Sequence, residues 1–202
     1  MSPRGAYKTL GSLVLASASP RRSELLGLAG LEFEVLPGEA EPMPEEGEPP
    51  AEYACRAALA KAMDAFARRP ENVVLAADTI VVLGTRILGK PSDEADALRT
   101  LRELAGRTHE VITGCAVCAP GRKPESFAVS TLVTMARVQD AALKAYVATG
   151  EPMDKAGSYA IQGHGGFLVQ RIEGSYSNVV GLPVAEVLEA FSTWGIIAPR
   201  AE

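Results

Sequence analysis

The stretch "SLVLASASPRRSELLGLAG" (residues 12–30) decides the fold class, because it joins a buried strand directly to a helix. Its first six residues are mostly apolar and predict the strand. Ser19 and Pro20 are the residue types typical of a helix N-cap and of the first helical position. Gly30 is expected to end the helix. A strand that leads into a helix in this way is typical of α/β proteins.

Two adjacent arginines, Arg21 and Arg22, fall in the first turn of this helix. Cations at the positive end of a helix dipole cost roughly 0.3–1 kcal/mol each. One interpretation is that both side chains are solvated and tolerate the penalty. The other is that they serve an anion, since backbone amides at a helix N-terminus favour anions and two guanidiniums can hold several phosphate oxygens. The stretch alone leaves a solvated pair and a site for phosphate or another polyanion as alternatives.

The rest of the chain alternates strands and helices, with no repeat and no linker. Further strands are expected at residues 33–37, 72–83, 109–120, 125–138 and 167–172. Helices are expected at 51–69, between the cap Ser92 and Gly106, at 140–150 and at 184–195. A hairpin is expected at 84–91, and loops at 38–50, 151–166 and 174–183. This order predicts one α/β domain, residues 1–202, with a mixed twisted sheet flanked by helices.

Composition limits the class of protein. The chain has 202 residues, of which 47% are hydrophobic, enough for a sizeable core. The net charge of −5 argues against a nucleic-acid-binding role, so cations for an anionic ligand must be gathered locally. No run of 18 apolar residues is present, so no membrane span is expected. Three cysteines give no disulfide framework, which favours a reduced, cytoplasmic protein.

Asp78 is the most informative single residue. It interrupts the apolar run "VVLAADTIVVL" (73–83). A carboxylate inside a buried strand must be paired, protonated or metal-bound, because burying it alone costs too much free energy. It is therefore a candidate metal ligand or general base. The alternative is that the strand ends or bulges at Ala77 and leaves Asp78 in a turn.

Other patterns are explained more simply by packing or solvation. Cys115 and Cys118 have the spacing of a metal-binding pair, but residues three apart on a strand point to opposite faces. Lys61, Lys90 and Lys155 each stand in an unusual setting, yet each alone is most simply a solvated lysine. No G-x-S-x-G motif is present, so serine-hydrolase chemistry has no support.

Four motifs in order resemble the Maf family of nucleoside triphosphate pyrophosphatases over about residues 12–197: "LASASPRRSELL", "AADTIVVLGTRILGKP", "EPMDKAGSYAIQG" and "NVVGLP". The resemblance implies an inosine-triphosphatase-like (Maf/Ham1), two-lobed domain with a central cleft. It implies hydrolysis of nucleoside triphosphates to the monophosphate and pyrophosphate, with a divalent metal such as Mg²⁺ or Mn²⁺. A homodimer and a house-cleaning role are implied as well.

The resemblance also implies roles for particular residues. Asp78 matches the catalytic proton acceptor and metal ligand. Three residues match the branch that prefers dTTP and UTP over methylated GTP, with modified pyrimidine nucleotides as further possible substrates: Arg22, Thr79 and Gln162. Four residues match the phosphate-binding and catalytic positions: Ser19, Arg21, Lys61 and Lys90.

The chain departs from the family pattern in the loop after the second strand. Family members commonly carry an acidic pair there, including a catalytic or metal-binding glutamate. Here "GEAEPM" offers Glu41 followed by Pro42, with Glu39 as the possible substitute. Glu41 is expected to be the second metal ligand.

The alternative to an enzyme is a regulator of septum formation, which would bind nucleotides without hydrolysing them.

Overall fold

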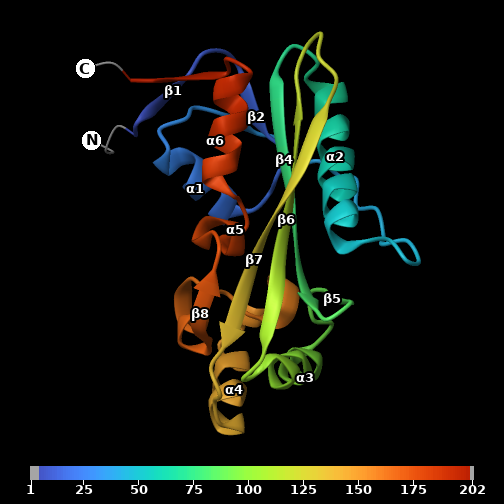
Figure 1. The fold of residues 1–202 in the computed structure, drawn as a ribbon, viewed down its shortest axis with the longest axis vertical. Helices are drawn as coiled ribbons and strands as arrows, with labels where there is room; N and C mark the ends of the chain where they lie inside the picture. Colours follow the sequence, from blue (N-terminus) through green and yellow to red (C-terminus); the bar gives the residue numbers. More distant parts are fainter. Residues whose placement is uncertain (1–4, 201–202) are drawn as a thin grey trace. The chain divides into compact units, whose positions relative to one another are not determined.

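The computed structural model describes residues 5–200, which fall into two compact units (Figure 1). The first unit contains residues up to 78, 113–128 and those from 181 onward, and the second contains 79–112 and 129–180. Three long strands contribute residues to both units: β4 (Val73–Leu83), β6 (Thr108–Cys118) and β7 (Glu125–Met135). The expectation of a single domain with a core at about 12–197 and a central cleft stays a prediction.

In the first unit the predicted strand and helix at residues 12–30 are confirmed as β2 (Leu13–Leu15) and α1 (Pro20–Leu28). Strand β2 lies parallel to both β3 (Glu34–Val35) and β4, and the sheet continues in the order β3-β2-β4-β6-β7. A separate antiparallel pair joins β1 (Tyr7–Thr9) to β9 (Ile197–Pro199).

Alternation along the strands divides the core of the first unit into two layers. One face of the sheet, including Leu15 and Leu75, packs against α1 and α6 (Val184–Thr193). The other face, including Val74 and Ala76, packs against the alanines of α2 (Pro50–Arg68). Figure 1 shows α2 on the opposite side of β4 from α1 and α6.

The second unit is built on the order β4-β6-β7-β8, with β5 (Arg86–Leu88) antiparallel to β4 and β8 (Val169–Glu173) antiparallel to β7. The hairpin predicted at 84–91 is therefore confirmed. Helices α3 (Glu94–Leu104) and α4 (Asp140–Val147) pack into one apolar cluster with these strands. The mixed α/β sheet with flanking helices predicted from the sequence is thus the observed fold.

Some expected boundaries are wrong. The cap of α3 is Asp93, not Ser92, because the Asp93 carboxylate accepts a hydrogen bond from the amide of Asp96 at 2.7 Å. The backbone of Ser92 instead donates to the Asp96 carboxylate at 3.0 Å. Gly106 does follow the helix end, with a left-handed φ of 70°.

Two expected loops contain helical turns. The segment 151–166 forms short 3-10 helices: η1 (Glu151–Asp154), η2 (Ala156–Ser158) and η3 (Gly163–Leu168). The segment 174–183 contains α5 (Tyr176–Val180). No helix within residues 5–200 is long and apolar enough to cross a membrane.

Candidate active site

Asp78 lies in the middle of β4, which runs unbroken from Val73 to Leu83. The alternative that the strand ends or bulges at Ala77 is therefore wrong. The Asp78 side chain is 17% exposed, and its Oδ1 lies 2.5 Å from Nζ of Lys61, which is 16% exposed. The largely buried carboxylate is thus satisfied by an ion pair with Lys61. This lysine is therefore not simply solvated, which is what its sequence setting alone would suggest.

Small residues on α2 bring Lys61 to this carboxylate. Ala58, Ala62 and Ala65 are fully buried against the sheet, so the helix backbone approaches β4 closely. Lys61 lies on the same helix, beside this alanine face. The lysine can therefore reach the strand with its ammonium while its stem packs along the helix.

The loop after β3 is fixed to α2 near Lys61. A Cβ atom at Gly38 would lie 2.4 Å from the carbonyl oxygen of Lys61, so the loop passes in direct contact with the helix backbone. One residue later, the amide of Glu39 donates to the Asp64 carboxylate at 2.8 Å. These contacts hold the beginning of the acidic loop, which carries Glu41, against α2 near Lys61.

Tyr53, which sequence analysis did not single out, is influenced by the charges of both candidate metal ligands. Burial raises the pKa of the Tyr53 hydroxyl, and the negative charges of Asp78 and Glu41 raise it further. The same hydroxyl donates to the carbonyl of Pro42 at 3.2 Å. Both carboxylates therefore act electrostatically on one phenol, and Glu41 itself is exposed.

Asp78 and Glu41 suit one particular kind of metal site. Among residues 5–200, no group of three or more His, Cys, Asp or Glu side chains could hold an ion, so a closed all-protein site is not formed there. Mg²⁺ is commonly held by one or two carboxylates together with water and substrate phosphates. Two carboxylate oxygen donors therefore fit a hard divalent cation that is shared with a phosphate ligand.

Arg22 is half-buried and hydrogen-bonded within the chain, so the interpretation of two solvated arginines is wrong for this residue. Its Nε donates to the carbonyl of Gly181 at 2.7 Å, and Nη1 donates to Oγ of Ser17 at 3.0 Å. Burial lowers the pKa of the Arg22 guanidinium, and the charge of Asp78 opposes that shift. Arg22 thus joins the first and last of the four motifs and adds a cation near Asp78.

Arg21 and Ser19 are differently placed. Ser19 occupies the N-cap position as predicted, but its side chain makes no capping bond, and its amide donates to Oγ of Ser17 at 3.2 Å instead. Arg21 is half-buried, and within the described chain its guanidinium makes no hydrogen bond or ion pair. Ser17, missed by sequence analysis, therefore fixes the start of α1, while the side chains of Ser19 and Arg21 make no hydrogen bond within residues 5–200.

The other candidates lie in the second unit. Thr79 follows Asp78 on β4 and is half-buried. Lys90 is exposed just after β5, and Gln162 is the half-buried N-cap residue of η3. The structure thus brings Lys61 to Asp78 in the first unit, which also holds Glu41 and the start of α1. Thr79, Lys90 and Gln162 belong to the second unit, and the roles expected for all of these residues stay predictions.

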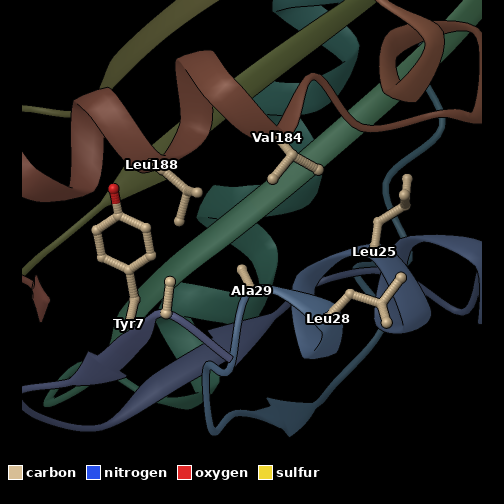
Figure 2. A pocket seen from close by; sticks show the side chains of 7 residues that line it. Tyr7, Leu25, Leu28, Ala29, Val184 and Leu188 are labelled. Carbon is tan, nitrogen blue, oxygen red and sulfur yellow. The ribbon is translucent and has the colours of Figure 1, made fainter. Parts of the chain in front are cut away.

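The cysteine pair and an apolar pocket lie outside this chemistry. Cys115 and Cys118 belong to different core layers, as predicted, and burial raises the pKa of the Cys115 thiol to about 12. A pocket of about 330 Å³ in the first unit is lined by apolar side chains from α1, β1 and α6, including Leu25, Leu28 and Leu188 (Figure 2). None of the candidate site residues lines it.

The first unit therefore defines an α/β protein with a cationic helix N-terminus and a lysine-paired carboxylate. The Maf-like protein family matches residues 12–194, and the chain belongs to this family. It is 49% identical to the dTTP/UTP pyrophosphatase of Oleidesulfovibrio alaskensis over 98% of this chain and 92% of that protein. It is 54% identical to the dTTP/UTP pyrophosphatase of Nitratidesulfovibrio vulgaris over 91% of this chain and 88% of that protein.

Similarity to solved structures is weaker. The Ham1 protein of Staphylococcus aureus matches with a TM-score of 0.48 and 15% sequence identity, over 91% of this chain and 99% of that one. The fold assignment rests on the strand pairing of the chain itself.

Proposed function

We propose that this protein is a nucleoside triphosphate pyrophosphatase that hydrolyses dTTP and UTP to the nucleoside monophosphate and pyrophosphate. The observation that carries the proposal is the Asp78 carboxylate, placed inside an apolar strand and paired with Lys61 at 2.5 Å. Relatives about half identical over nearly the whole chain are named dTTP/UTP pyrophosphatases, which supports the same activity here.

Asp78 is the group that acts on the attacking water. Its carboxylate orients or deprotonates a water that attacks the α-phosphorus, and pyrophosphate leaves. Lys61 keeps the charge of this carboxylate balanced before substrate binds and then faces the phosphates. Asp78 and Glu41 would hold a divalent cation, Mg²⁺ or Mn²⁺, whose charge offsets that of the triphosphate. Glu41 is the proposed second ligand from the family pattern, with Glu39 as its possible substitute.

Local cations bind the triphosphate, which the net charge of −5 would otherwise repel. Arg21 and Ser19 offer donors at the positive end of α1, where backbone amides favour anions. Lys61 and Lys90 supply further positive charge, which stabilises the developing charge on the leaving pyrophosphate.

Base selection is assigned to Thr79, Gln162 and Arg22. Gln162 has an amide that can both donate to and accept from a pyrimidine. Arg22 contributes to selection while it holds Gly181 in place. Modified pyrimidine triphosphates fall within the same proposal, as does a house-cleaning role that removes them.

A regulator of septum formation without turnover is not favoured, because the similar proteins carry names of enzymes. We further propose a reducing, cytoplasmic setting, supported by three cysteines that are all free. A homodimer is proposed from the family resemblance alone, and light scattering of the purified protein would test it.

Incubation with dTTP and Mg²⁺ tests the activity directly. The expected products are dTMP and pyrophosphate in equal amounts, with UTP also cleaved and dGTP cleaved far more slowly. Release of single phosphate, or a wide preference for methylated GTP over dTTP and UTP, would contradict the proposal.

A further inference from the structure

We propose that Glu151 is a positioning residue that holds the backbone on both sides of Gln162 and thereby sets the preference for pyrimidine nucleotides. The inference rests on the proposed function, in which Gln162 contacts the base. All of the residues that carry it lie in the second unit.

The Glu151 carboxylate accepts three hydrogen bonds, two of which come from the segment that follows Gln162. Its Oε2 accepts the amide of His164 at 2.9 Å, and its Oε1 accepts the amide of Gly165 at 2.9 Å. Oε1 also accepts the hydroxyl of Tyr146 at 2.9 Å. Partial burial opposes ionisation of Glu151, but the hydrogen bonds from the two amides outweigh it and the pKa is lowered. A charged acceptor makes these bonds stronger than neutral ones.

Tyr146 extends the same network to the segment before Gln162. Its hydroxyl oxygen accepts the amide of Ala160 at 3.1 Å while its proton goes to Glu151. The Tyr146 ring is buried and meets Phe167 edge-on, with centroids 6.1 Å apart. Residues 160, 164 and 165 are therefore tied to one anchored tyrosine–glutamate pair, and Gln162 lies between them in the chain.

Two glycines show how closely the loop wraps this pair. A Cβ atom at Gly163 would lie 2.4 Å from Oε2 of Glu151, and the residue has a left-handed φ of 81°. A Cβ atom at Gly165 would lie 2.6 Å from the Tyr146 hydroxyl and 2.5 Å from the carbonyl of Ala160. Only glycine fits at either position without moving the loop.

The Gln162 side chain is left out of this network. It is half-buried at the N-cap of η3, makes no capping bond, and has no hydrogen bond to any residue in 5–200. The backbone is thus fixed by Glu151 and Tyr146 while the amide keeps its donors and acceptor. A recognition group held on an ordered backbone loses less entropy when it binds, and this increases selectivity.

The variant Glu151→Gln tests the inference by replacing the charged acceptor at nearly constant volume. An amide group in place of the carboxylate cannot accept from all three donors, since its nitrogen is a donor. We expect the ratio of kcat/KM for dTTP to that for dGTP to fall about tenfold, as the loss of one charge-assisted hydrogen bond predicts. Tyr146→Phe removes the hydroxyl shared with Ala160 and should lower the same ratio, which gives a second test if Glu151→Gln folds poorly.

A double-variant cycle with Gln162→Ala separates positioning from general destabilisation. If Glu151 acts through Gln162, Glu151→Gln has little further effect on the ratio once Gln162 is alanine. Glu173→Gln, an exposed glutamate on β8 in the same unit, is the matched control and should leave the ratio unchanged.

The outcomes distinguish this inference from the proposed function. If the unaltered protein cleaves dTTP and UTP but both variants lower kcat/KM for every nucleotide equally, the positioning role is wrong and the activity stands. Additive effects of Glu151→Gln and Gln162→Ala on the ratio would also overturn it. If the unaltered protein releases no pyrophosphate, the proposed function is wrong and the inference falls with it.

Discussion

The Lys61 ammonium lies 2.5 Å from the Asp78 carboxylate, and the two come from different elements, α2 and β4. Helix α2 approaches the sheet through buried alanines, so the ion pair is a consequence of the packing between the two elements. Removing either partner leaves the other as an uncompensated charge in a mostly buried place, and the two removals have different consequences.

Asp78→Asn should abolish turnover while the protein still binds dTTP. The amide cannot take a proton from water, and loss of a general base costs about 10²–10⁴ in rate. Initial rates of pyrophosphate release measure the first effect, and titration calorimetry with dTTP measures the second. Glu34→Gln, which alters an exposed carboxylate paired with Arg69, is the control and should keep full activity. Substantial activity in Asp78→Asn would remove this residue from the mechanism.

Lys61→Met should lower the free energy of unfolding by about 3 kcal/mol, because it leaves a largely buried carboxylate without its cation. The double variant Lys61→Met with Asp78→Asn should recover most of that loss, since no unpaired charge remains. Urea denaturation of the four proteins measures the cycle. If the double variant is as unstable as the sum of the single variants, the pair is not coupled in the way the 2.5 Å contact indicates.

Gly38→Ala tests the placement of the loop that carries Glu41. The new methyl group would meet the backbone of Lys61 at 2.4 Å, so the loop must move away from α2. We expect the Mg²⁺ concentration for half-maximal activity to rise about tenfold, with a stability loss of about 1–3 kcal/mol from the added crowding. Gly11→Ala is the matched control, because no atom lies within 4 Å of its added Cβ. An unchanged Mg²⁺ requirement in Gly38→Ala would show that Glu41 does not bind the metal.

Strands and helices with a clear apolar period could be predicted from the sequence, whereas short elements could not. Strand β4 was evident because eleven residues hold a single charged side chain. Strand β9 was missed because three residues are too few to show an alternation of apolar and polar side chains. Its partner β1 also lies near the other end of the chain.

From the sequence alone, the only site residues that could be identified were those whose neighbours in the sequence are of an unusual type for them. Asp78 was found because a carboxylate in an apolar strand demands a partner. Ser17 was missed because its role depends on Arg22, whose guanidinium binds Ser17 and the distant Gly181 together. Tyr53 was missed because the charge of Asp78 that acts on it comes from a residue distant in sequence. The glutamate at 151 resembled an ordinary loop residue, since the amides that it binds lie thirteen and fourteen positions later.

His109 should make the stability of the protein fall as the pH is lowered from 7 towards 5. Burial lowers the pKa of His109 in the folded state to about 4, against 6.5 in an unfolded chain. Below pH 6.5 the unfolded state therefore binds a proton that the folded state does not bind. The resulting loss in the free energy of unfolding reaches its full value, about 3 kcal/mol, near pH 4. The ring is 2% exposed and its Nε2 shares a 2.7 Å hydrogen bond with the Tyr159 hydroxyl, so an imidazolium there would be poorly solvated.

Chemical denaturation at pH 7, 6 and 5 checks this expectation against His109→Phe, which has no titrating ring at that position. The variant should be less stable at pH 7, since it leaves the Tyr159 hydroxyl without its partner, but its stability should change less over the interval. Carboxylates whose pKa is lowered, such as Glu48 at about 2, lose their stabilising effect only at more acidic pH. Parallel pH profiles for the two proteins would show that His109 is not the source of the dependence.

Replacing each of the two adjacent arginines of α1 by lysine should affect a different quantity, stability for Arg22 and KM for Arg21. Arg22→Lys keeps the charge but cannot hold both Gly181 and Ser17 with one compact ammonium, so stability should fall by about 2 kcal/mol. Arg21→Lys removes no hydrogen bond within residues 5–200, so stability should stay within about 0.5 kcal/mol. Its effect should appear instead as an increase of about threefold to tenfold in KM for dTTP, since lysine lacks the planar fork that binds phosphate oxygens in pairs. Urea denaturation and initial-rate kinetics on the two variants measure both quantities, and equal stability losses would mean that the two arginines do not have the separate roles that their contacts indicate.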